Sequence, residues 1–234
     1  MRIDERARVS YVFDGDTVRL ADGRRLRLIG IDTPELARAD ETDEPLARVA
    51  RTRLQELLTA GANELQLQFD SQRTDHYGRL LAHAYLNNGD NVAVQLLRQG
   101  LATALVVPPN TREADCYDAI EHAARAERRG LWALPRYRPQ NSTELPPDAT
   151  GFHIVRGRIT AVRTPSGSTW LDLEGPLSLH IGGRDRAHFA AGYLEGLAGQ
   201  EVEVRGWIRT ERNGLRMNIR HPAALTGLTQ ADGG

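Results

Sequence analysis

Residues 11–35 read YVFDGDTVRLADGRRLRLIGIDTPE and organise the first half of the chain. Alternating apolar and polar side chains predict one strand at 9–14, a second at 17–20 and a third at 24–31. The turns DGD and ADG that separate them contain Asp-Gly pairs, which favour tight connections. We therefore expect a three-stranded antiparallel meander.

Carboxylates stand at the ends of these strands. Asp16 opens the second strand and Asp32 closes the third, so antiparallel pairing can bring them together. Two carboxylates, supplemented by waters and by a backbone carbonyl such as that of Thr33, suit a hard cation such as Ca²⁺. The stretch has no histidine or cysteine, which disfavours zinc. We expect one Ca²⁺ held by Asp16, Asp32 and Thr33.

An arginine and a third carboxylate complete the expected site. Pro34 fixes an extended backbone and so sets the direction of Glu35, which we expect to orient a water. Arg27 lies on the third strand, and an arginine beside a divalent ion indicates a phosphate whose charge both balance. The alternative is that these are only solvated strand ends and turn residues.

Three separated motifs, DGDTVRL, RLRLIGIDTPE and RTDHYGRLLA, together resemble the staphylococcal nuclease (thermonuclease) family. The resemblance covers about residues 6–134. It implies a phosphodiesterase that hydrolyses DNA or RNA and breaks the 5′ P–O bond, leaving 3′-phosphate and 5′-hydroxyl ends. We therefore expect a Ca²⁺-dependent nuclease. The alternative is a catalytically inactive nucleic-acid-binding scaffold.

The resemblance also implies roles for single residues. Arg79 matches the family's arginine that contacts the scissile phosphate opposite Arg27, so the expected catalytic residues are Arg27, Glu35 and Arg79. Tyr77 matches a tyrosine that hydrogen-bonds the nucleotide's other phosphate. His76 stands where the family often has lysine, which alters that contact and its pH dependence.

A polar loop at 36–45 departs from the resembled family, whose loop here is rather basic. Its acidic residues are Asp40, Glu41, Asp43 and Glu44. Such a loop would weaken non-specific affinity for DNA. A second cation site is one alternative. The other is a solvated loop whose last acidic residues favour the N-terminus of the following helix.

Composition excludes several classes of protein. Of 234 residues, 40% are hydrophobic and 26% charged, which indicates a folded chain. The net charge of −1 excludes a uniformly basic nucleic-acid binder, so attraction for phosphate must be local. The single cysteine, Cys116, excludes an internal disulfide, and we expect it to be packed.

The sequence contains no apolar run long enough to span a membrane. The charged start, MRIDERARV, does not resemble a signal peptide. Because members of the resembled family are commonly exported, we expect a secreted or periplasmic protein whose signal is absent from this chain. A cytoplasmic protein is the alternative. No protein partner is implied, and we expect a monomer.

The element order predicts a mainly β fold with helices: two tandem OB-fold-like five-stranded barrels, the first resembling staphylococcal nuclease. Residues 1–134 form the expected catalytic domain, 135–151 a proline-rich linker, 152–228 the accessory barrel and 229–234 a disordered tail. In the accessory barrel, three strands, a helix at 184–197 and two strands follow the OB-fold order. No DGDT or DTPE motif recurs there, so we expect it to lack catalytic activity.

Period-2 alternation in the accessory barrel points several polar or aromatic side chains outward. They are Arg205, Trp207, Arg209, Arg216 and Arg220. A tryptophan among arginines is typical of a surface that binds nucleic-acid strands. The pattern fits a barrel docked against a neighbouring domain equally well.

Overall fold

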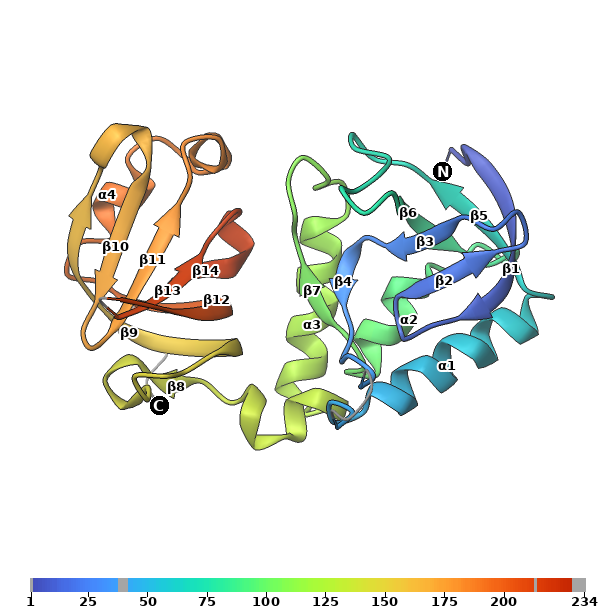
Figure 1. Cartoon of the computed structure of the whole chain (residues 1–234), viewed down its shortest axis with the longest axis horizontal. Helices are drawn as coiled ribbons and strands as arrows, with labels where there is room; N and C mark the ends of the chain where they lie inside the picture. Colours follow the sequence, from blue (N-terminus) through green and yellow to red (C-terminus); the bar gives the residue numbers. More distant parts are fainter. Residues whose placement is uncertain (1, 38–41, 213, 229–234) are drawn as a thin grey trace. The chain divides into compact units, whose positions relative to one another are not determined.

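The computed structural model describes residues 2–37, 42–212 and 214–228. The chain divides into two units, Met1–Leu134 and Pro135–Gly234, whose elements are labelled in Figure 1. Each unit contains a closed five-stranded barrel with OB-fold strand order. The expected fold class of tandem OB-fold-like barrels is therefore confirmed.

The barrel of the first unit has the neighbour order β1-β2-β3-β6-β5. Its strands are β1 (Glu5–Val12), β2 (Thr17–Leu20), β3 (Arg25–Leu28), β5 (Glu64–Gln68) and β6 (Leu80–Tyr85). Strands β1, β2 and β3 form the expected antiparallel meander, and β3 pairs with β6 in parallel. In β2 and β3, buried Val18 and Leu26 alternate with exposed arginines, as a barrel with a filled interior requires.

The expected third strand, 24–31, is two strands in the structure. After β3 the chain leaves the barrel, and β4 (Gly30–Asp32) pairs antiparallel with β7 (Thr103–Leu105). Gly30 causes the change because its φ of +86° is a conformation that residues with a side chain rarely adopt. The break places Asp32 at the end of a separate short strand.

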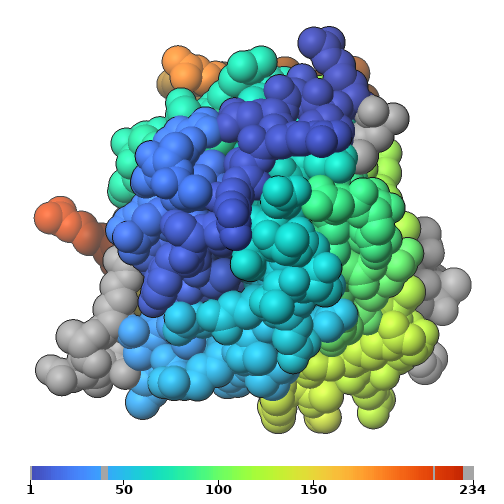
Figure 2. All heavy atoms as spheres, turned by 90° about the vertical axis from the view of Figure 1, so that its right-hand side faces the viewer, coloured from blue at the N-terminus to red at the C-terminus, as the bar shows by residue number. Residues whose placement is uncertain are grey.

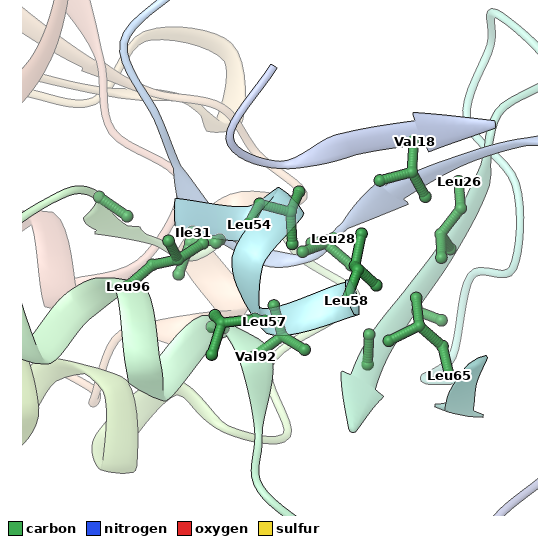
Figure 3. Close-up of a cluster of buried hydrophobic side chains, with 14 of the residues drawn as sticks. Val18, Leu26, Leu28, Ile31, Leu54, Leu57, Leu58, Leu65, Val92 and Leu96 are labelled. Atoms are coloured by element: carbon green, nitrogen blue, oxygen red, sulfur yellow. The ribbon is translucent and has the colours of Figure 1, made fainter. Parts of the chain in front are cut away.

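Three helices cover the first barrel: α1 (Ala47–Ala60), α2 (Val92–Arg98) and α3 (Ala114–Ala126), followed by the 3₁₀ turn η1 (Gly130–Ala133). Figure 3 shows Leu54, Leu57 and Leu58 of α1 packed with Leu28 of β3 and Leu96 of α2. Burying each leucine contributes about 2 kcal/mol. Figure 2 shows β1, dark blue, and α1, cyan, on one face of this unit. Cys116 in α3 is exposed, so the expectation that it is packed is wrong.

Tyr117 of α3 joins the helices to the barrel. Its ring is buried, and its hydroxyl lies 2.9 Å from His83 Nδ1 and 2.9 Å from the Asn91 side-chain nitrogen. A Cβ atom added at Gly30 would lie 2.3 Å from this ring. The backbone break that positions Asp32 is therefore packed directly against Tyr117.

The barrel of the second unit closes because β12 pairs with both β9 and β13. Its strands are β9 (Gly151–Arg163), β10 (Thr169–Leu173), β11 (Leu177–Ile181), β12 (Glu201–Glu211) and β13 (Gly214–Asn218). A short strand lies at each sheet edge, β8 (Gln140–Asn141) and β14 (Leu225–Leu228), and single 3₁₀ turns occur at η4 (Pro165–Gly167) and η6 (Pro222–Ala224). The parallel pairing of β11 with β13 repeats that of β3 with β6.

The expected helix at 184–197 is wrong. The segment forms a 3₁₀ turn, η5 (Asp185–His188), and one helical turn, α4 (Tyr193–Gly196). Buried Phe189 is extended between them, and Gly192 has a φ of +77°, so the backbone cannot continue as one helix.

Residues 135–151, expected to form a linker, are a structured part of the second unit. They contain η2 (Pro135–Tyr137), β8 and η3 (Ser142–Glu144), and β8 pairs in parallel with β9. Leu145 and Ala149 are buried in the second core. Proline and polar residues predicted flexibility here, but the apolar residues among them anchor the segment. The expected tail, 229–234, lies outside the described residues. Among the helices described, none has the length and apolar character needed to cross a bilayer.

Replacing Gly30 with alanine should destabilise the first unit more than the same change at Gly89. Both glycines have nearly the same φ, +86° and +87°, but nothing lies within 4 Å of a Cβ atom at Gly89. Each variant loses about 1–2 kcal/mol for the left-handed conformation, and Gly30→Ala a further 1–3 kcal/mol, roughly, for overlap with Tyr117. Urea unfolding measures both free energies, and equal losses would contradict the packing argument.

The His83 imidazole should make the protein less stable as the pH falls from 6.5 to 4. The pKa of His83 is lowered from 6.5 to about 4, mainly because the side chain is buried. The negative charge of Asp70 opposes this shift, and the positive charge of Arg112 adds to it. The unfolded chain therefore takes up a proton that the folded chain resists, and up to about 3 kcal/mol is lost across this window. In His83→Gln the loss should be smaller by that amount. Parallel curves of unfolding free energy against pH would contradict this assignment.

Candidate active site

One arginine joins the ends of three strands. The Arg27 guanidinium, from β3, forms an ion pair with Asp16, which precedes β2. Its Nη2 also donates to Asp32 Oδ1 of β4 at 2.7 Å. Only 13% of the Arg27 side chain is exposed, and Asp16 is buried. The structure therefore brings together Asp16, Arg27 and Asp32, as the strand arrangement predicted.

Hydrogen bonds from the DTPE segment orient the Asp16 carboxylate. Asp16 Oδ2 accepts from the Thr33 backbone N–H at 2.9 Å and from Thr33 Oγ1 at 2.8 Å. The other oxygen, Oδ1, accepts from Thr17 Oγ1 at 3.0 Å. With Arg27 also on Oδ2, the carboxylate is held in one orientation, and most of the donors gather on one oxygen.

Asp14 belongs to this charge group, although the sequence suggested only a turn. Its Oδ1 accepts from the N–H groups of Asp16 and Thr17, at 3.0 and 2.7 Å, and so fixes the DGD turn. Burial and the charge of Asp16 raise the pKa of Asp14 to about 7. Aspartate two residues before another in a turn is the only sequence signal for this role.

The charges in the group are unequal. Burial, opposed by the charge of Arg27 and assisted by the carboxylates of Asp16 and Glu35, raises the pKa of Asp32 to about 7. Burial would lower the pKa of Arg27, but the surrounding aspartates outweigh it and raise that pKa. Three aspartates therefore surround one guanidinium, and the group carries excess negative charge.

The residues fit a hard divalent cation. In the described part of the chain, no group of three or more His, Cys, Asp or Glu side chains is arranged to hold a metal. The set predicted from the sequence contains only two such side chains, Asp16 and Asp32, with the Thr33 carbonyl as the third ligand. These donors are all oxygen atoms, and three aspartates, Asp14, Asp16 and Asp32, act on the single Arg27 guanidinium.

Glu35 lies at the edge of this group, at the start of the acidic loop. Its backbone N–H donates to Glu44 Oε2, and the Glu44 N–H donates to the Glu35 carbonyl, both at 3.0 Å. Glu35 is exposed, and its charge and that of Glu44 reach Asp32. Glu44 thus closes the loop, whereas α1 has no acidic residue in its first turn. Of the other predicted loop acids, Asp43 accepts from the Ala37 N–H at 2.9 Å, whereas Asp40 and Glu41 lie outside the described residues.

Arg79 has a different partner from Arg27. Its Nε donates to Asp75 Oδ2 at 2.7 Å, and its guanidinium lies 5.6 Å from the Tyr77 ring centre. Tyr77 is 74% exposed, and the His76 ring lies 3.7 Å from it. Arg79, predicted to be catalytic, and Tyr77 and His76, predicted to bind substrate, are therefore neighbours on one loop. Arg79 precedes β6, whose parallel partner β3 carries Arg27.

Among the five candidate residues of the second barrel, Arg205, Trp207 and Arg209 are alternate residues of β12 and so share one side of that strand. Arg209 pairs across the strands with Arg216, while Trp207 lies against Phe152 with ring centres 5.3 Å apart. Arg216 and Arg220 line a hollow of about 300 Å³. Both already have acidic partners: Arg216 pairs with Glu211 at 2.6 Å, and Arg220 with Asp185 at 3.4 Å. Arg205 is half-buried.

The chain is similar to known proteins over its first unit. The family model described as staphylococcal nuclease homologue matches residues 25–134. Endonuclease YncB of Bacillus subtilis (strain 168) is 36% identical over 129 residues, which cover 53% of this chain and 60% of that protein. The SPbeta prophage-derived endonuclease YokF of the same organism is 37% identical over 129 residues, covering 53% of this chain and 43% of the relative.

A thermonuclease of Staphylococcus intermedius is 34% identical over 128 residues. The aligned part covers 53% of this chain and 74% of that thermonuclease. The chain thus spans less than two thirds of the two Bacillus relatives but most of the staphylococcal one. On this similarity, and with the DGDT, DTPE and YGR segments placed as described, the chain belongs to the staphylococcal nuclease family.

Proposed function

We propose that the chain is a Ca²⁺-dependent nuclease that hydrolyses phosphodiester bonds of DNA or RNA and leaves 3′-phosphate and 5′-hydroxyl ends. The observation that carries the proposal is the bond of one buried arginine to two aspartates within a group of excess negative charge. Relatives named endonuclease and thermonuclease support the reaction class.

Asp16, Asp32 and the Thr33 carbonyl would hold the ion. Bound Ca²⁺ would act as a Lewis acid toward a non-bridging phosphate oxygen. The carboxylates keep their orientation through the Thr33 and Thr17 hydrogen bonds. With Ca²⁺ balancing the charge of the carboxylates, the Arg27 guanidinium would be available to a phosphate as well as to the aspartates.

Glu35 would act on the attacking water. Its backbone is fixed on one side by Pro34 and on the other by the paired hydrogen bonds with Glu44. An exposed carboxylate beside a buried charge group can accept a proton from water or orient that water. Attack at phosphorus breaks the bond to the 5′ oxygen.

Arg79 would approach the same phosphate from the loop before β6. In the structure Asp75 holds its side chain in place, and Asp75 has a lowered pKa, because these hydrogen bonds outweigh its partial burial. The Arg79 side chain is 30% exposed, so a phosphate could compete with Asp75 for its guanidinium. Two guanidinium groups then oppose the charge that grows in the transition state.

Replacing Glu35 with glutamine or Arg79 with alanine should lower kcat/KM on plasmid DNA on the order of a thousandfold, because each removes an interaction formed in the transition state. Both variants should retain the wild-type melting temperature within a few degrees. Glu56→Gln and Arg98→Ala, which change exposed residues on α1 and α2, serve as matched controls and should keep full activity.

The assay is the rate of acid-soluble nucleotide release from DNA and RNA, with Ca²⁺ and with a chelator. Wild-type activity in either variant would contradict the assigned roles. A wild-type protein that binds DNA but releases no nucleotide with Ca²⁺ would instead establish the inactive scaffold.

A further inference from the structure

Arginines stack on two aromatic rings on the outer surface of the first barrel. Tyr11 of β1 and Phe13, which follows it, have ring centres 5.0 Å apart. Arg19 of β2 lies 5.4 Å from the Tyr11 centre and 5.3 Å from that of Phe13. Arg25 of β3 lies 4.8 Å from Phe13, and Arg51 of α1 lies 5.5 Å from Tyr11. We call these five residues the arginine–aromatic patch.

Strand register places the patch on the surface. Tyr11 pairs with Arg19, and Arg19 pairs with Arg25, so the three form a row across β1, β2 and β3. Their neighbours Val18 and Leu26 point into the barrel, so the row points outward. Arg51 reaches the row across the junction of β1 and α1 seen in Figure 2, and donates to Tyr11 Oη at 3.3 Å.

The arginines of the patch lack acidic partners among the described residues. Arg19, Arg25 and Arg51 form no ion pair there, whereas neighbouring Arg24 pairs with both Glu5 and Asp22. The whole chain has a net charge of −1, so this local positive charge is not an effect of composition. The rings hold three like charges together without neutralising them.

The row continues toward the active site. Arg25 and Arg27 are alternate residues of β3 on its outward side, about 7 Å apart along the strand. Leu26 pairs with Leu80, so Arg79 and Arg25, the residues before them, are neighbours on adjacent strands. An extended polyanion that crosses Arg27 and Arg79 therefore meets Arg25 next, then Arg19.

We propose that the arginine–aromatic patch binds the sugar-phosphate backbone of the nucleic acid outside the scissile phosphate. The proposal rests on the proposed function, because the strand must enter the Arg27 site. It assigns Arg19, Arg25 and Arg51 to successive phosphates. The rings orient the guanidinium planes, and the binding is independent of base sequence. A polyanion fits better than a single phosphate because the charges form a line on an open surface.

The test is the binding of a fluorescein-labelled single-stranded oligonucleotide to the full chain carrying Glu35→Gln, followed by anisotropy in Ca²⁺ at several salt concentrations. Adding Arg19→Gln, Arg25→Gln and Arg51→Gln should raise Kd about tenfold or more at 0.1 M salt. The slope of log Kd against log salt should fall by about 2, since each phosphate contact on a single strand contributes about 0.7. Arg24→Gln, with its two acidic partners, is the matched control and should leave Kd within about twofold.

In an otherwise wild-type chain, the triple variant should raise KM for long DNA and leave hydrolysis of a dinucleotide unchanged. An unchanged Kd and slope would overturn the proposal, as would equal losses on both substrates. If the triple variant fails to fold by circular dichroism, Arg25→Gln alone should still lower the slope by about 0.7, and no change would overturn the assignment. Absence of hydrolysis in the wild type would refute the nuclease function, whereas the binding measurement would still test the patch, because it does not depend on turnover.

Discussion

The two ion pairs of Arg27 are the constraint on which the rest of the first unit depends. They join β3 to the residue before β2 and to the end of β4. Removing the arginine would leave two carboxylates close together and poorly solvated, a change that typically costs several kcal/mol. With Asp14 added, the carboxylates outnumber the guanidinium, and the Ca²⁺ that we propose would offset this excess of negative charge.

Much of the first unit follows from local sequence. Alternation around Val18 and Leu26 and the Asp-Gly turns specify the meander, which brings Asp16 near Arg27. Asp32 also reaches Arg27, but it lies on β4, which pairs with the distant strand β7. Gly30 was missed because periodicity does not reveal a positive φ, and its reason lies in Tyr117, far along the chain. The raised pKa of Asp14 likewise depends on burial, which no local pattern shows.

In the second unit, local patterns predicted the strands but not the segments between them. Its strand order was predictable because Val202 and Val204 alternate with polar residues, and both are buried. The segment before β9 was predicted to be a linker because proline and polar residues make up most of it, whereas buried Leu145 and Ala149 anchor it in the second core. The prediction of a helix before β12 was wrong at Gly192 for the same reason as the prediction of one strand through Gly30. Both glycines have a positive φ, which composition does not reveal.

The two barrels share strand order but differ in how their arginines are neutralised. In the second barrel Arg216 and Arg220 pair with Glu211 and Asp185. In the first, the arginine–aromatic patch has no acidic partner among the described residues, and it leads to Arg27. Shared topology thus carries different chemistry, since function depends on the site rather than the fold.

Calcium titration by calorimetry tests the central claim most directly, because it measures the charge group without requiring catalysis. The wild-type chain should bind one Ca²⁺, Asp16→Asn should abolish that binding, and Asp172→Asn, which removes a carboxylate paired with Arg163 in the second barrel, should preserve it. Equal binding by the wild type and Asp16→Asn, or no binding by the folded wild type, would contradict the account.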